Sequence, residues 1–142
     1  MTSLSPRLKA IVDALPLEEG MRVLEIGCGP GAAAREVARR LKQGHVLAID
    51  RSAKAIAQAE AACTAEIASG RLSLRCVAAE DFALGPGEAP YDLAFAVRVG
   101  AFDGRHPEAG KLALARIAAA LKPGARLLID GGDPLRELPL GD

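Results

Sequence analysis

The sequence has 142 residues, of which 50% are hydrophobic and 25% are charged, a composition typical of globular chains and not of disordered or collagen-like ones. This length suits one domain, and a second independent core is not expected. Positive and negative residues number 18 each, so no net positive charge attracts a polyanion, and nucleic acid is disfavoured as a partner.

Cysteine and histidine are too few and too scattered for a disulfide framework or a metal site. The three cysteines, Cys28, Cys63 and Cys76, include no C-x-x-C spacing, and the two histidines are His45 and His106. We expect reduced thiols in a cytoplasmic protein that holds no metal. No apolar run approaches the roughly 18 residues needed to cross a bilayer, so neither a signal peptide nor a membrane segment is expected.

The chain opens with a predicted helix, which Ser5 can cap and in which Pro6 suits the first position. Short apolar segments then alternate with segments of helical spacing. The predicted strands are residues 21–26, 45–49, 72–77, 91–99 and 126–130, and the predicted helices are residues 31–43, 52–69 and 107–121. Residues 81–90 contain a Gly-Pro-Gly sequence and predict one turn followed by a loop.

Alternating strands and helices require crossover connections. The pattern therefore predicts an α/β fold: a doubly wound, mostly parallel sheet of about five strands with helices on both faces. We expect a single domain over residues 1–142, with an N-terminal helix in 1–20, a core in 21–130 and a polar, turn-rich tail in 131–142 that looks separable.

A glycine cluster follows the first predicted strand and precedes a helix. It reads Glu25-Ile26-Gly27-Cys28-Gly29-Pro30-Gly31. Glycines here let the backbone turn sharply and approach a ligand, and the helix N-terminus offers free N–H groups. The alternative is an ordinary strand-to-helix turn, which three alternating glycines after an acid make the weaker interpretation.

Asp50 ends the second predicted strand, about twenty residues beyond the glycine cluster. Its carboxylate can accept from both hydroxyls of a ribose. The alternative is that Asp50 caps the helix that begins near Ser52. The spacing favours the ribose role.

Residues 23–31 resemble motif I of the class I S-adenosylmethionine-dependent methyltransferases. Four later segments resemble motifs of that family in the same order: Val46–Asp50, Ala79–Phe82, Tyr91–Ala94 and Leu121–Gly124. The resemblance covers about residues 21–130. It implies a Rossmann-like fold, S-adenosyl-L-methionine as cofactor and methyl transfer as the reaction.

The resemblance also implies which residues bind the cofactor. They are Glu25, Gly27, Cys28, Gly29, Gly31, Asp50, Arg51, Ser52, Ala79, Glu80, Asp81 and Phe82. Ala78 stands where the family often has an aspartate, so the acceptor for the adenine amino group stays open between Glu80, Asp81 and the main chain. Either acid can instead be solvated in a loop.

An NAD(P)-dependent oxidoreductase is the nearest competing enzyme class. Its loop should read G-x-G-x-x-G, whereas this loop reads G-x-G-x-G. Glu25 would lie close to a pyrophosphate but suits the ammonium of a methionine moiety. The charge therefore favours the methyl donor over a dinucleotide.

Methyl transfer depends mainly on proximity and orientation, and a general base is needed only where the acceptor must lose a proton. His106, after the fourth predicted strand, is the candidate base, and capping a helix or facing solvent is its alternative role. Arg98 near the end of that strand is expected to face the cleft, where it holds an anionic acceptor or a structural carboxylate.

The acceptor is not identified by the sequence. No [DN]-P-P-[YFW] tetrad or Pro-Cys pair follows the fourth predicted strand, and only one Tyr and three Phe are present for stacking, so base methylation is disfavoured. We expect a small-molecule acceptor in preference to a protein. The alternative is a non-catalytic S-adenosylmethionine-binding module that acts with a partner subunit.

The resembled family usually has seven strands, and the sequence predicts five, without the last two. A second copy in a homodimer or a partner subunit would then cover the sheet edge. A large substrate that supplies its own surface, or a truncated chain, are the other expectations.

Overall fold

The computed structural model describes residues 4–102 and 104–140, so the two ends of the predicted single domain and position 103 lie outside the described residues. The helices are α1 (Pro6–Ala14), α2 (Ala32–Arg40), α3 (Ala53–Ala62), α4 (Thr64–Ala68) and α5 (Pro107–Ala120), with single 3-10 turns η1 (Ala79–Asp81) and η2 (Gly100–Phe102). The strands are β1 (Arg22–Ile26), β2 (His45–Asp50), β3 (Leu72–Cys76), β4 (Tyr91–Ala96), β5 (Leu121–Asp130) and β6 (Leu135–Leu138).

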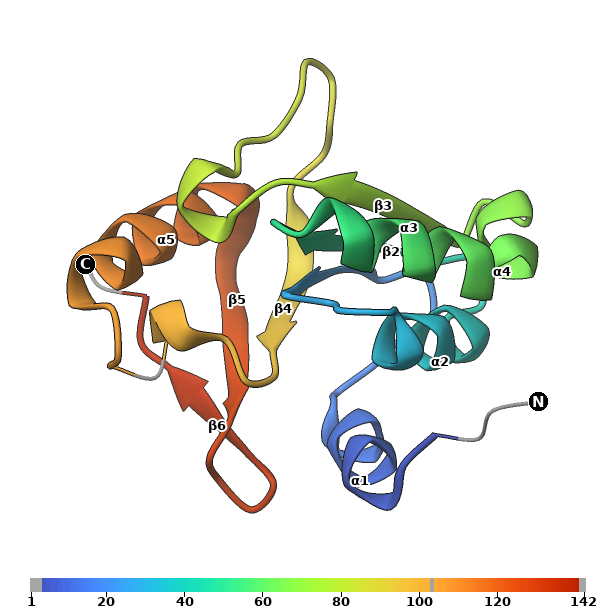
Figure 1. The fold of residues 1–142 in the computed structure, drawn as a ribbon, viewed down its shortest axis with the longest axis horizontal. Helices are drawn as coiled ribbons and strands as arrows, with labels where there is room; N and C mark the ends of the chain where they lie inside the picture. The colour runs from blue at the N-terminus through green and yellow to red at the C-terminus, as the bar shows by residue number, and fades with distance from the viewer. Residues whose placement is uncertain (1–3, 103, 141–142) are drawn as a thin grey trace.

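The strands form one sheet in the order β3-β2-β1-β4-β5-β6 (Figure 1). Neighbours from β3 to β5 pair in parallel, and β6 pairs antiparallel with β5. The chain adds strands on one side of β1 and then crosses to add β4 on the other side. The carboxyl ends of β1 and β4 therefore flank the point where ligands bind in open α/β sheets. The predicted doubly wound, mostly parallel fold is confirmed.

The expected five strands are one too few, because β6 lies in the segment that was predicted to be a separable tail. Leu135 and Leu138 are half-buried, while Arg136 and Glu137 between them are exposed. Four residues with a polar centre have neither the alternation nor the apolar run that marks a strand in a sequence. Pairing with β5 supplies the order that the local pattern lacks. Coverage of the remaining sheet edge by a second copy or a partner stays a prediction.

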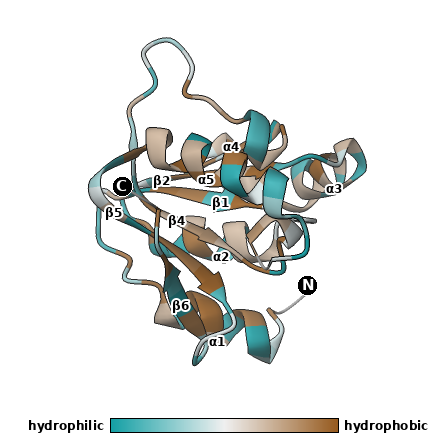
Figure 2. Ribbon diagram, turned by 90° about the vertical axis from the view of Figure 1, so that its left-hand side faces the viewer, coloured by the Kyte–Doolittle hydropathy of each residue, from teal (hydrophilic) through white to brown (hydrophobic). Residues whose placement is uncertain are grey.

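The sheet separates two apolar cores, because successive side chains of each strand point to opposite faces. Val23 and Val46 belong to the core beneath α1, α2 and α3, whereas Leu24 and Leu47 belong to the core beneath α5 and η1. The strands are accordingly mostly brown, that is hydrophobic, in Figure 2. Helices on both faces, as predicted, leave the strand ends as the place where polar side chains gather.

The predicted helix over residues 52–69 is two helices, α3 and α4, which are separated at Cys63. Cys63 is fully buried, and its Sγ donates to the carbonyl of Gly31 at 3.7 Å. The chain bends here because the end of α3 packs on the glycine turn that follows β1. This contact fixes the position of the turn relative to the second core layer.

No helix in residues 4–102 and 104–140 is long and apolar enough to cross a membrane. Within the same residues, no group of three or more histidine, cysteine, aspartate or glutamate side chains is placed to hold a metal ion.

The packing of Gly31 gives a stability prediction. Its φ is +90°, and an added Cβ would lie 3.1 Å from both Ala59 Cβ and Cys63 Sγ. Gly31→Ala should lower the free energy of unfolding by about 2–4 kcal/mol, since backbone strain and crowding add. Gly70→Ala is the matched control, because φ is +83° there and an added Cβ meets nothing within 4 Å. Urea denaturation should show the smaller loss for Gly70→Ala, and equal losses would contradict the packing argument.

Candidate functional site

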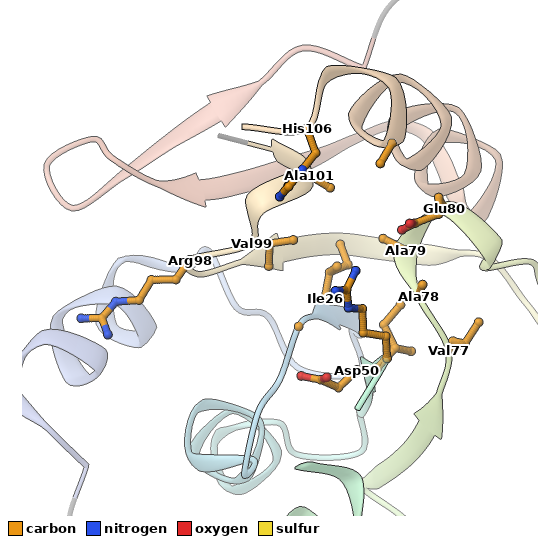
Figure 3. A pocket seen from close by; sticks show the side chains of 14 residues that line it. Ile26, Asp50, Val77, Ala78, Ala79, Glu80, Arg98, Val99, Ala101 and His106 are labelled. Carbon is orange, nitrogen blue, oxygen red and sulfur yellow. The ribbon is translucent and has the colours of Figure 1, made fainter. Parts of the chain in front are cut away.

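A cavity of about 360 Å³ lies beyond the carboxyl ends of β1, β2 and β4 (Figure 3). We call it the main cavity. Its polar lining comes from Asp50 and Arg51 after β2, Glu80 in η1, Arg98 after β4, and His106 at the start of α5. Residues that are far apart in the sequence thus meet at the point where the strand order reverses.

The glycine turn between β1 and α2 is tied to the end of β2. The backbone N–H groups of Gly27 and Cys28 both donate to the carbonyl of Ile49, at 2.8 and 3.0 Å. The N–H of Gly29 donates to Asp50 Oδ2 at 2.9 Å. The turn that the sequence predicts as a ligand cradle is therefore preformed by its contacts with the neighbouring strand.

Asp50 is half-buried at the edge of the main cavity, and each of its oxygens accepts one backbone hydrogen bond. Oδ2 accepts from Gly29, and Oδ1 accepts from the N–H of Ser52 at 2.8 Å. The cap of α3 is Ser52 itself, whose Oγ accepts from Ala55. A carboxylate has about four acceptor positions, so Asp50 keeps capacity for hydroxyl donors.

Glu25 is the second carboxylate of the site, and it is buried at the end of β1. Its side chain is only 3% exposed, and Oε1 has no hydrogen-bond partner among the described residues. Burial, with the nearby Asp50 carboxylate, raises the pKa of Glu25 to about 8. An unsatisfied buried carboxylate beside a second one marks a place for a positively charged group.

Glu25 lines a smaller cavity of about 280 Å³, which we call the glutamate pocket. The pocket lies against α1 and shares Gly27 and Arg98 with the main cavity. Cys28 also lines it, and burial raises the pKa of the Cys28 thiol, so this cysteine is not a nucleophile at neutral pH. The two cavities together form one continuous candidate site around the glycine turn.

The segment around η1 separates the predicted residues into two groups. Ala79 and Glu80 line the main cavity, whereas Asp81 is exposed outside its lining. Phe82 is fully buried in the core, with the Arg75 guanidinium 5.4 Å from its ring centre. For the adenine amino group, the geometry favours Glu80 or the main chain over Asp81.

Other predicted residues also lie outside the main cavity. Ser52 is committed to capping α3, and Gly29 and Gly31 do not line the cavity. The sequence analysis missed an apolar part of the lining, which comprises Val77, Ala78, Val99, Ala101 and Ala109. Three of these follow a strand by one to three residues, and that position is the signal that could have found them.

His106 and Arg98 both border the main cavity, and both are exposed. His106 precedes α5 without forming a side-chain cap, so its ring is not engaged by the helix. The side chain of Arg98 extends away from Asp50 in Figure 3 and forms no hydrogen bond or ion pair with a described residue, which leaves its predicted structural carboxylate without support. Neither residue is placed to act on Asp50 or Glu25.

The sequence of residues 23–124 matches the family of methyltransferase domains. The chain belongs to this family. The matched residues run from the start of β1 into β5 and include every element that contributes to the main cavity.

Individual relatives of the methyltransferase domain carry different names. The chain is 40% identical over 124 residues to a protein-L-isoaspartate O-methyltransferase of Methylorubrum extorquens, an alignment that covers 87% of this chain and 47% of that protein. The chain spans about half the length of the curated relatives it matches.

Two solved structures show the same fold. A methyltransferase from Geobacter sulfurreducens, in complex with S-adenosyl-L-homocysteine, is 25% identical with a TM-score of 0.67, over 89% of this chain and 48% of that one. The [4+2]-cyclase SpnF is 27% identical with a TM-score of 0.69, over 86% and 42%. Because one is named a methyltransferase and the other a cyclase, the fold alone does not fix the reaction.

The site of the methyltransferase domain suits a ligand that carries a cation, hydroxyl donors and a flat apolar part. The glutamate pocket offers an unpaired carboxylate, Asp50 offers acceptor positions, and Val77, Ala78 and Val99 line an apolar wall. The same two carboxylates are unsuited to a pyrophosphate, whose charge they would repel.

Burial of Glu25 predicts a pH dependence of stability. Its raised pKa means that ionisation is less favourable in the folded chain, so Glu25 lowers the free energy of unfolding as pH rises from 4.5 toward about 8. Glu25→Gln should lack this decrease. Between about pH 4 and pH 9, the stability difference between variant and wild type should grow by roughly 3 to 5 kcal/mol in favour of the variant. Parallel stability curves from chemical denaturation would contradict the burial of an unpaired carboxylate.

Proposed function

We propose that this methyltransferase domain binds S-adenosyl-L-methionine and transfers its methyl group to a small-molecule acceptor. The observation that carries the proposal is the buried Glu25, whose Oε1 lacks a partner beside Asp50. When bound, the sulfonium supplies an electrophilic methyl group. The domain itself binds and orients the two reactants and excludes water, which is most of what this reaction requires.

Each part of the donor has a counterpart among the described residues. Glu25 would hold the ammonium, and the main chain of the glycine turn would lie along the methionine and ribose portions. Asp50 would accept from the ribose hydroxyls with the positions that Gly29 and Ser52 leave open. Glu80 and the main chain around Ala79 would contact the adenine edge.

His106 is the proposed general base for an acceptor that must lose a proton. Its ring borders the main cavity and is not held by a cap interaction. An imidazole can take up a proton near neutral pH. For an acceptor that is already ionised, this group would not be needed.

A protein-borne acceptor is the second candidate. It is favoured by the 40% identity to a relative named protein-L-isoaspartate O-methyltransferase. Assays with free small molecules and with isoaspartyl peptides separate the two candidates.

Ligand titration tests the cofactor. Calorimetry should show binding of S-adenosyl-L-homocysteine and no binding of NAD. Asp50→Asn should weaken the former about tenfold or more, because a carboxylate acceptor for hydroxyls becomes a neutral amide. Asp13→Asn is the matched control: this exposed acid on α1 pairs with Lys9 and Arg40, does not line either cavity, and should leave the affinity unchanged. Binding of NAD alone would reject the proposed function.

The role of His106 is tested with an acceptor that screening with labelled donor identifies. For a neutral acceptor, His106→Ala should slow methyl transfer about 10²-fold or more and remove the rise in rate between about pH 5.5 and 7.5. His45→Ala is the control, since His45 lies at the opposite end of the sheet and contacts Gly70. Equal pH–rate profiles for wild type and His106→Ala would remove His106 from the mechanism.

A further inference from the structure

A separate hollow of about 490 Å³ lies beyond the ends of β4 and β5. We call it the arginine hollow. It is lined by Arg98, Arg105, Arg136 and Asp130, and Phe102 and Ile129 are among its apolar walls. A cavity of this size, with apolar walls and a few convergent charged groups, has the features of a small-molecule site.

The charge of the arginine hollow is positive, because its acid is already engaged. Asp130 Oδ2 accepts from Arg7 of α1 at 2.9 Å, and Oδ1 accepts from the backbone N–H of Arg98 at 3.0 Å. The side chains of Arg98 and Arg136 form no hydrogen bond or ion pair with a described residue. The chain as a whole is electrically balanced, so this local excess is not a general basic character.

Arg98 is held in an uncommon backbone conformation at the edge of the hollow. Its φ is +59°, in the left-handed region that residues with a side chain rarely adopt. The hydrogen bond from its N–H to Asp130 fixes it there. Strained residues that the surrounding structure holds in place are concentrated at functional sites.

The arginine hollow adjoins the main cavity. Arg98 and Val99 line both. Val99 also lies directly over the glycine turn, since a Cβ added to Gly27 would come within 2.6 Å of Val99 Cγ2. A molecule with one end in the hollow can therefore extend past Val99 toward the site proposed for the methyl donor.

We infer that the arginine hollow is the acceptor subsite and that it recognises an organic carboxylate. This inference rests on the proposed function and adds the chemical class of the substrate. Guanidinium groups bind carboxylates with paired hydrogen bonds, and the walls formed by Phe102 and Ile129 accommodate the apolar part of the acceptor. The carboxylate can belong to a free acid or to a polypeptide, and the experiment separates these sources.

The experiment is an NMR titration of the ¹⁵N-labelled chain, with and without S-adenosyl-L-homocysteine. The free-acid probe is 4-phenylbutyrate, compared with its uncharged amide. The peptide probe is a blocked tetrapeptide with one aspartate, compared with its asparagine analogue. The acid should bind at least about fivefold more tightly than the amide, and the shifted resonances should cluster in residues 98–102 and 129–136.

Variants connect the preference to the arginines. Arg98→Gly suits the left-handed backbone, and combined with Arg136→Gln it should abolish the preference for the acid. Arg116→Gln is the matched control, because this exposed arginine on α5 lies outside both cavities, and the preference should be retained. Added salt should weaken binding of the acid and leave binding of the amide unchanged.

The outcomes are distinguishable. Equal affinities for acid and amide in both probe pairs, or a preference that survives in the double variant, overturn the inference. A preference limited to 4-phenylbutyrate supports a free acid, and one shared by the peptide supports the protein-borne source. Binding of S-adenosyl-L-homocysteine without any carboxylate preference rejects the inference and leaves the proposed function intact. Carboxylate binding without binding of S-adenosyl-L-homocysteine rejects the proposed function, and with it the acceptor role.

Discussion

The connection between the glycine turn and the end of β2 is the constraint on which the rest of the site depends. Two backbone N–H groups of the turn share the Ile49 carbonyl, and a third reaches the Asp50 carboxylate. These bonds align the ends of β1 and β2 and place Glu25 and Asp50 on the same face of the sheet. Cys63 and Ala59 support the turn from α3. The polar geometry is thus set by main-chain contacts, which tolerate changes in the surrounding side chains.

The pairing of two carboxylates in a desolvated place weakens the fold while it prepares the site. Each carboxylate disfavours ionisation of the other, and Glu25 lacks the hydrogen bond that would offset its burial. A native chain retains such a pair only where the surrounding packing is strong enough to hold it. The two continuous cores on either side of the sheet supply that packing.

Local patterns predicted the parallel sheet, the glycine turn and Asp50, because apolar runs, glycines and strand-end acids each act through their immediate neighbours. They failed where distant contacts decide. β6 exists because β5 offers it a pairing edge, and Phe82 is buried because Arg75 and the second core cover it. The left-handed backbone of Arg98 depends on Asp130, which lies more than thirty residues further along the chain. No spacing within the sequence reports such a contact.

Asp130 links three parts of the molecule that the sequence separates widely. It binds the side chain of Arg7 from α1 and the backbone of Arg98 after β4, and it belongs to the end of β5. Since Arg7 neutralises it, the electrostatic potential of the arginine hollow depends on a helix that covers the opposite cavity. Detachment of α1 would expose the Asp130 carboxylate to the hollow while it uncovered Glu25. The N-terminal helix therefore controls the electrostatics of both ends of the site through one ion pair.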